Sequence, residues 1–454
     1  MSPAREGSRK QGRWLVGAAC AALVAVLAGS RAAADWLAPD ASFREAQMVL
    51  RYAQRDTAGH ASDLALIDSL ALAHLRVGHV AEARKLFERV MAERPGDATA
   101  LAALGKFALW ADQNAAAESL LVAAGDVDQA RAELYAARLR LGKWAEAETL
   151  SEALQDGGRR PLLEFLASNP PMAVKGTRAK LAFDKIWPAP LVKVKLNGAT
   201  VLMMVDTGTP GLLIDKMTAT QEKVKLIEGQ RLTMWTGTHV ATRNALAQRL
   251  ELGDIEFTNV PASVLSLAKL SLEVNLQSTP IAGVIGMEVL RHFDVTFDYR
   301  KRALELSPPG TAAKLQATRV PFELWGEDEL TVWGSINGGR HLAMTLSTGM
   351  PGGGFGAPDV VFEEHGLKSG GVSKMVKGAG TWLQGRAWAQ VNVPALTVGN
   401  VAFDKVAGWA GAMEPVEMWR HGVRRDGLLG PGIFLKRRVT IDWTRRDIVF
   451  ESSD

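Results

Sequence analysis

Cysteine is almost missing from this chain of 454 residues, since Cys20 is the only one. Cys20 lies within an apolar run near the N-terminus, and removal of that run would leave no thiol in the protein. Disulfide frameworks and cysteine-based catalysis are therefore excluded for the processed chain. Its core must hold the fold together without covalent cross-links.

Histidine is scarce as well, and charge of one sign is nowhere concentrated. The eight histidines are scattered and no two stand at a metal-ligand spacing, so we predict no metal and no cofactor. The 53 Lys and Arg residues against 49 Asp and Glu residues give a formal net charge of +4. Because the basic residues are spread along the chain, the sequence argues against a nucleic-acid partner.

One long uninterrupted apolar run is present, from Leu15 to Gly29, and it follows a stretch rich in Arg and Lys. Three alanines at 32–34 then offer the small side chains that a signal peptidase requires. We therefore predict that residues 1–34 are the signal peptide of a bacterial protein, and that the mature chain is periplasmic or secreted. The run is shorter than the ~20 residues that span a bilayer, and an uncleaved membrane anchor is the alternative. No other membrane contact is predicted.

Residues 35–168 are predicted to form an all-α domain of helical hairpins, because apolar positions follow helical spacing in a segment rich in Ala, Leu, Glu and Arg. Residues 75–83 match residues 139–147 at an offset of 64 positions, close to twice the ~34-residue period of tetratricopeptide repeats. The segment resembles such repeats, which implies a possible protein partner; an Ala-rich bundle of another kind is the alternative. Small residues at matching positions should let neighbouring helices approach closely: Gly78, Ala83, Gly142 and Ala147.

Glycines and prolines at residues 157–161 and 169–171 interrupt the helical pattern, and we predict a linker at 169–177. Beyond it, short runs of aliphatic and β-branched residues alternate with turn residues such as Asn197-Gly198. This pattern continues to the C-terminus. The predicted fold class is therefore multi-domain α + β, with an all-α part followed by an all-β part.

The all-β part contains one unit twice. Asp206-Thr207-Gly208 follows an apolar run, and Ser347-Thr348-Gly349 follows a similar run 141 residues later. Further on, Ile285-Gly286 corresponds to Leu429-Gly430 at an offset of 144 residues. Hairpin turns and strand ends between these landmarks recur in the same order, so the sequence predicts two equivalent lobes.

These landmarks resemble the retropepsin-like and pepsin-like aspartic peptidases, in which two facing Asp-Thr-Gly turns supply the catalytic carboxylates. The resemblance implies a double-lobed acid-protease fold over residues 178–454, with lobes at 178–310 and 311–454. It also implies that Asp206 and Ser347 occupy the catalytic positions, and that a β-hairpin flap covers a peptide or protein substrate. The other implied site residues support the turns (Thr207, Gly208, Thr348 and Gly349) or belong to the flap (Trp235, Gly237 and Thr238).

The second lobe departs from these enzymes at the position that carries the chemistry. Two facing carboxylates share one proton, so one activates a water while the other polarises the scissile carbonyl. The Ser347 hydroxyl can donate a hydrogen bond but cannot share an acidic proton with Asp206. Losing a positioned acid costs a factor on the order of 10² to 10⁴ in rate. We predict an exported aspartic-type endopeptidase in which Asp206 activates water and Ser347 completes a degenerate dyad.

Three other interpretations stay open at the level of the sequence. The chain could bind extended peptides without cleaving them, because the second acid is missing. It could act as an envelope assembly scaffold through its helical repeats. Two chains could also pair their first lobes to bring two Asp206 carboxylates together, although the fused second lobe should already occupy that face.

Overall fold

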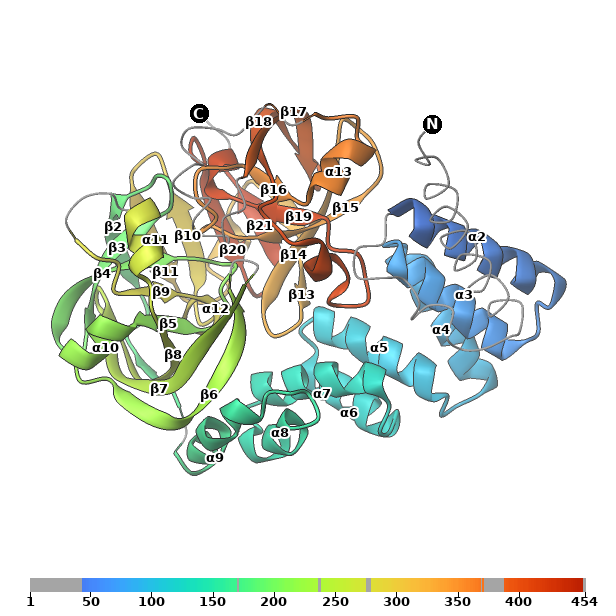
Figure 1. The fold of residues 1–454 in the computed structure, drawn as a ribbon, viewed down its shortest axis with the longest axis horizontal. Helices are drawn as coiled ribbons and strands as arrows, with labels where there is room; N and C mark the ends of the chain where they lie inside the picture. The colour runs from blue at the N-terminus through green and yellow to red at the C-terminus, as the bar shows by residue number, and fades with distance from the viewer. Residues whose placement is uncertain are drawn as a thin grey trace, which may run out of the picture.

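The computed structural model describes residues 43–169, 171–235, 238–274, 279–368, 370 and 388–451. The predicted signal peptide and Gly237 of the predicted flap lie outside these residues. Helices fill the first part of the described chain and strands dominate the rest (Figure 1). The predicted multi-domain α + β fold class is therefore confirmed.

The helices pack side by side in an arc that runs beneath the β part (Figure 1). Aspartate side chains cap the N-termini of two helices. Asp63 accepts hydrogen bonds from the amides of Ala65 and Leu66 before α3, and Asp97 accepts one from the amide of Ala100 before α5. The helices are α2 (Phe43–Gly59), α3 (Leu64–Arg76), α4 (Val80–Glu93), α5 (Ala98–Trp110), α6 (Asn114–Ala123), α7 (Asp128–Arg140), α8 (Trp144–Ser151) and α9 (Arg160–Ser168), with a 3-10 turn η2 (Gly157–Arg159) before α9.

The small residues of the helical repeat have two different roles. Ala83 and Ala147 are fully buried, so they allow the close helix approach that the sequence predicts. Gly78 and Gly142 instead lie in the turns after α3 and α7, with φ of 85° and 69°. The expectation of a packing role was wrong for these two glycines, because a left-handed turn that ends a helix requires glycine there.

Most elements of the two lobes correspond to each other in the same order. The first lobe contains β3 (Leu191–Leu196), β4 (Ala199–Val205), β5 (Leu212–Asp215), α10 (Lys216–Gln221), β6 (Lys225–Trp235), β7 (Thr238–Leu252), β8 (Ile255–Leu265), α11 (Ala268–Val274), β9 (Gly283–Ile285) and α12 (Met287–Leu290). The second contains β13 (Glu323–Trp325), β14 (Glu329–Ile336), β15 (Leu342–Leu346), β16 (Phe355–Ala357), α13 (Asp359–Glu364), β17 (Ala389–Val398), β18 (Val401–Ala410), η4 (Pro415–Trp419), β19 (Gly427–Leu429) and η5 (Pro431–Ile433).

Equivalent strands of the two lobes make equivalent pairs. In the first lobe β4 runs parallel to β9, with Val205 opposite Ile285. In the second lobe β15 runs parallel to β19, with Leu346 opposite Leu429. All four residues are buried to at least 98%, so each pair brings an apolar strand end under the turn that follows β4 or β15. The duplication seen in the sequence is thus a duplication of strand topology.

The lobes are joined by a shared sheet in the strand order β12-β21-β20-β10-β11-β2. Its centre pairs β10 of the first lobe with β20 of the second, and the hydroxyls of Thr296 and Thr440 meet there at 2.8 Å. A short strand inside the predicted linker, β1 (Ala173–Lys175), pairs with β8. The shared strands are β2 (Ala179–Lys185), β10 (Asp294–Asp298), β11 (Ala303–Ser307), β12 (Thr318–Pro321), β20 (Arg438–Asp442) and β21 (Asp447–Phe450), and a 3-10 turn η3 (Ala312–Lys314) precedes β12.

The helical arc is packed against the second lobe through a continuous apolar core. The rings of Trp110 on α5 and Trp325 on β13 stack with their centroids 4.7 Å apart, and both side chains are buried. Arg140 on α7, also buried, donates to the backbone oxygens of Gly326 and Glu327 at 2.8 and 2.9 Å. Burial of a large aromatic side chain contributes about 1.5–3 kcal/mol, so this junction is a stable one.

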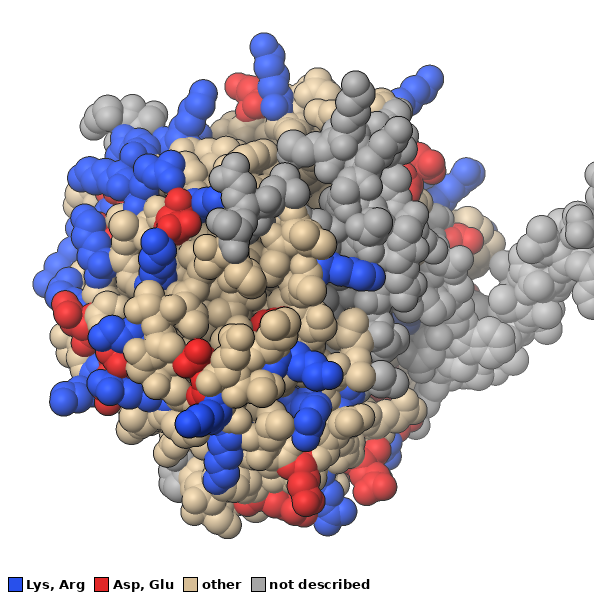
Figure 2. All heavy atoms as spheres, turned by 60° about the vertical axis from the view of Figure 1, so that its left-hand side comes forward, with Lys and Arg blue, Asp and Glu red and all other residues tan. Residues whose placement is uncertain are grey.

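The arc also contacts the first lobe, near the start of the β6–β7 hairpin. Arg231 on β6 pairs with Asp156 at 2.6 Å, and the Asn244 amide donates to the Gly158 oxygen at 2.7 Å. The arc therefore bridges both lobes. On the outer face of the first lobe, basic and acidic side chains are interspersed (Figure 2), and some pair across strands, as Lys195 does with Glu251. None of the helices in the described ranges is long and apolar enough to cross a membrane.

Candidate active site

Asp206 lies at the end of β4, where the strand turns sharply. Its backbone amide donates to the Ile285 oxygen at 3.0 Å, which continues the pairing with β9. The carboxylate then accepts within its own turn, at Oδ1 from the Gly208 amide (2.9 Å) and at Oδ2 from the Thr209 hydroxyl (2.7 Å). The turn therefore fixes the carboxylate by local hydrogen bonds.

Ser347 lies at the end of β15 in the same setting. Its amide donates to the Leu429 oxygen at 2.9 Å, as that of Asp206 does to Ile285. Its hydroxyl donates to Asp206 Oδ1 at 3.2 Å, and the Gly349 amide donates to the same oxygen at 2.8 Å. Asp206 and Ser347 are only 6% and 8% exposed, so the pair is largely shielded from water. The structure thus brings together the two positions that the sequence singles out.

The two glycines of the turns leave room for this approach. A Cβ on Gly208 would lie 2.6 Å from Ser347 Oγ, and a Cβ on Gly349 would lie 2.5 Å from Asp206 Cγ. Real Cβ atoms do not come that close to other atoms, so any other residue at either position would push the facing turn away. Glycine is required here by close contact, and neither position has a positive φ.

Thr207 and Thr348 hold the two turns to each other by reciprocal hydrogen bonds. The amide of each residue donates to the hydroxyl of the other at 3.1 Å. Each hydroxyl then donates across the interface to a strand end, Thr207 to the Leu346 oxygen at 3.0 Å and Thr348 to the Val205 oxygen at 2.9 Å. All four groups are buried, so the hydrogen bonds are protected from competition by water. The first lobe therefore packs against the second lobe of its own chain. This contact occupies the face through which the first lobes of two chains would have to pair.

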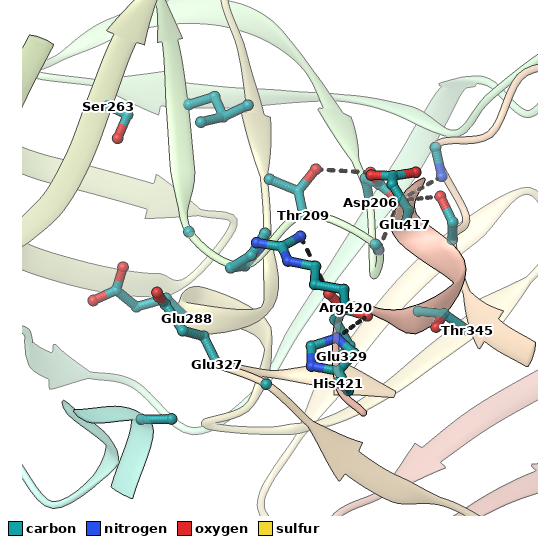
Figure 3. Close-up of a pocket in the computed structure, with 18 of the residues that line it drawn as sticks. Asp206, Thr209, Ser263, Glu288, Glu327, Glu329, Thr345, Glu417, Arg420 and His421 are labelled. Carbon is teal, nitrogen blue, oxygen red and sulfur yellow. Dashed lines mark hydrogen bonds and ion pairs between the residues drawn. The ribbon is translucent and has the colours of Figure 1, made fainter. Parts of the chain in front are cut away.

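Both turns face a cavity of about 560 Å³. The cavity has three walls, because residues of the first lobe, the second lobe and the helical arc all line it (Figure 3). The arc contributes Tyr135 and the segment around Asp156 and Arg159, which the sequence analysis did not assign to the site. Only the folded chain reveals this wall, since nothing in the repeat pattern shows which of its faces meets the lobes.

The predicted flap corresponds to the β6–β7 hairpin. Trp235 and Thr238 are paired at its described end, and Gly237 lies outside the described residues. Arg231 lines the cavity from the same hairpin and is held by Asp156 of the helical arc. The role of Trp235, Gly237 and Thr238 as a flap stays a prediction.

Two further residues of the cavity were not found from the sequence. Thr209 donates to Asp206 as described above, and the second lobe has Met350 at the corresponding position. Glu288 lies on α12, two residues after Gly286, and lines the cavity. The sequence contained a signal that could have identified both residues, because each differs from its counterpart in the second copy of the repeated unit. In the case of Glu288 the counterpart is Gly432.

No group of three or more His, Cys, Asp or Glu side chains among the described residues is arranged to hold a metal ion. A carboxylate fixed by four donors, a serine hydroxyl and an adjoining cavity can hold and polarise a water molecule.

In its fold and site the chain resembles a double-lobed retropepsin-like unit preceded by tetratricopeptide-like repeats. Residues 192–289 match the sequence model of the aspartyl protease family, and residues 74–141 match that of the tetratricopeptide repeat. These matches confirm the resemblance inferred from the motifs.

One solved structure similar to this chain is that of a retropepsin-like aspartic protease from Rickettsia conorii. It is 19% identical, with 30% of this chain and 91% of that chain covered, and its TM-score is 0.21. No curated protein matches the chain.

Proposed function

We propose that this protein is an aspartic-peptidase-like hydrolase that cleaves peptide bonds with a water activated by Asp206. The observation that carries the proposal is the 3.2 Å contact between Ser347 Oγ and Asp206 Oδ1, made by two turns that are locked together and open to a cavity. The match of residues 192–289 to the aspartyl protease family supports the same chemistry.

In this proposal Asp206 acts first as a base and then as an acid. Oδ1 accepts three hydrogen bonds and Oδ2 accepts one from Thr209, which leaves Oδ2 with capacity to take a proton from a bound water. As the water oxygen attacks the scissile carbonyl, that proton moves to Asp206. The same proton then passes to the leaving nitrogen when the carbon–nitrogen bond breaks, which regenerates the carboxylate.

Ser347 has a narrower role than a second carboxylic acid. Its hydroxyl carries one hydrogen, which can be donated either to Asp206 or to the oxygen that becomes negative during attack, but not to both at once. One neutral hydrogen bond stabilises the developing charge less than a shared acidic proton does. We therefore expect slow turnover relative to a site with two carboxylates.

A diverse peptide library incubated with the purified protein at acidic and neutral pH tests the proposal, with products identified by mass spectrometry. An Asp206→Asn variant is the matched control, because asparagine has nearly the same shape and cannot accept the proton. We expect cleavage by the parent protein and none by the variant. Identical cleavage by both proteins, or none by either, would end the proposal.

A second candidate is a protein that binds peptides in the same cavity without cleaving them. The specific observation in its favour is the serine at position 347, because the cavity and the locked turns persist without the second acid. It predicts peptide binding in calorimetry together with no products from the library. An envelope scaffold that acts through the helices alone is less favoured, because the helical arc itself lines the cavity.

We further propose that the protein is exported, with residues 1–34 removed, and that it works in the periplasm or outside the cell. The support is the order of basic, apolar and small residues in the sequence. Mass spectrometry of the protein isolated from cell fractions tests this, and the expected N-terminus is Asp35. An intact N-terminus in the cytoplasmic fraction would overturn it, and an intact one in the membrane fraction would favour the uncleaved anchor.

A further inference from the structure

Glu288 stands out among the residues that line the cavity because the duplicated unit has it on one side only. The corresponding residue of the second lobe is Gly432, at the same offset of 144 that relates Gly286 to Gly430. A Cβ on Gly432 would lie 2.7 Å from backbone atoms of Gly353, so that lobe has no space for a side chain there. The cavity therefore carries a first-lobe carboxylate that has no counterpart at the corresponding position of the second lobe.

Backbone hydrogen bonds attach Glu288 to the turn that carries Asp206. The Met287 amide donates to the Thr209 oxygen at 2.8 Å, and the Glu288 amide donates to the Pro210 oxygen at 2.7 Å. The Glu288 carboxylate lies beside the same loop, since a Cβ on Gly211 would be 3.3 Å from its Oε2. Its position relative to Asp206 is thus set by rigid local structure rather than by a mobile segment.

Most acidic side chains that line the cavity are already neutralised by a basic partner. Among the described residues, Glu288 makes no side-chain hydrogen bond and no ion pair, although it is partly buried. The neutralised ones are Glu133 with Lys106 (2.7 Å), Asp156 with Arg231 (2.6 Å), Glu327 with Arg159 (3.0 Å), Glu329 with Arg425 (2.7 Å) and Glu417 with Arg425 (3.6 Å).

The surroundings of Glu288 compensate its charge only in part. Burial raises the pKa of Glu288 to about 7, and the nearby Glu327 and Asp328 raise it as well, against the opposing charges of Arg159 and Arg291. Burial acts in the same direction on Glu327, which lies near Glu288 (Figure 3), but Arg159, Arg231 and Arg420 together outweigh it and the pKa of Glu327 is lowered. A carboxylate in this setting is stabilised when a ligand places a cation beside it.

We propose that Glu288 forms a subsite for a lysine or arginine side chain of the peptide bound in the cavity. The subsite rests on the proposed function in that it concerns the same cavity, and it makes the protein selective for basic residues near the bond that faces Asp206. The lysine or arginine supplies the basic partner that Glu288 lacks and that the nearby Glu327 and Asp328 already have. The second lobe, with Gly432, cannot duplicate this preference.

Binding measurements test the subsite without any need for turnover. Two mixed-sequence octapeptide libraries with blocked termini, one with Lys and the other with Gln at a fixed central position, are titrated at pH 8 against the Asp206→Asn variant. A charge-assisted contact of this kind is expected to favour the Lys library by about tenfold or more. Adding Glu288→Gln should remove the preference, whereas adding Glu417→Gln should keep it, because Glu417 already has Arg425 as a partner.

The outcomes separate the subsite from the peptidase proposal. Equal binding of the two libraries, or a Lys preference that survives Glu288→Gln, would overturn the subsite whether or not the protein cleaves peptides. A Lys preference that depends on Glu288 in a protein that cleaves no peptide would support the subsite and overturn the peptidase. Circular dichroism of each variant shows that a lost preference does not come from a lost fold.

Discussion

Replacing Ser347 with aspartate supplies the acid that the second lobe does not have. The Ser347 oxygen already lies 3.2 Å from Asp206 Oδ1, on a turn held by Thr207 and Thr348. A carboxylate attached at the same Cβ would reach hydrogen-bond distance from Asp206. Two carboxylates at that distance cannot both ionise, so they would share one proton and titrate as a coupled pair.

We expect Ser347→Asp to increase the rate of peptide cleavage by a factor on the order of 10² to 10⁴, the usual contribution of a positioned acid. This corresponds to about 3–5 kcal/mol of transition-state stabilisation, because each tenfold in rate is 1.36 kcal/mol. The gain should be confined to acidic pH, since the pair works only while it holds one proton. As pH rises through the higher of the two pKa values, the second proton leaves and the activity should fall.

The assay compares initial rates on one fluorogenic peptide at pH 4 to pH 8 for the parent protein, Ser347→Asp and Ser347→Asn. Asparagine has nearly the size of aspartate but no acidic proton, so it controls for the change in volume. A folded Ser347→Asp variant that binds the peptide and is no faster than Ser347→Asn at any pH would refute the reasoning. The rate of peptide cleavage would then not be limited by the missing acid.

Three further predictions concern the same cavity and its supports. Thr348→Val removes the acceptor for the Thr207 amide and the donor to Val205, and leaving these buried groups unpaired should lower the free energy of unfolding by about 2–4 kcal/mol in urea titrations. Glu288→Gln should raise the free energy of unfolding at pH 8 by up to about 3 kcal/mol and leave it unchanged at pH 4. A carboxyl whose pKa is raised from 4.5 to about 7 by folding opposes folding only once it ionises, so an equal effect at both pH values would contradict this. Trp110→Ala should lower the free energy of unfolding by about 3–5 kcal/mol, because it empties the stack on Trp325, and a change below 1 kcal/mol would refute a shared core.

The placement of Asp206 beside Ser347 could be predicted from the sequence because the information is local. Each turn follows an apolar strand and is followed, at nearly constant spacing, by the segment that packs under it. The resemblance to aspartic peptidases then implies that the two turns face each other. The close approach of Gly208 to Ser347 and that of Gly349 to Asp206 are related by the same symmetry. These are properties of the repeated unit rather than of its surroundings.

The third wall of the cavity could not be predicted in this way. Which face of the helical arc meets the lobes depends on contacts such as Trp110 with Trp325 and Asp156 with Arg231, whose partners are far apart in the sequence. The role of Glu288 depends on that wall, because Arg159, Glu327 and Asp328 become its neighbours only in the folded chain. Gly78 was misread for a related reason, since its left-handed φ belongs to a turn that the periodicity does not show.

The pairing of Thr207 with Thr348 inside one chain has a consequence for how a peptide would be oriented. A cavity made by two identical copies looks the same from either end, and a peptide can enter it in two equivalent directions. Here the two lobes differ, because the first has Glu288 where the second has Gly432 at the corresponding position. A peptide would therefore have one preferred direction, and the position of its basic residue would decide which of its bonds meets Asp206.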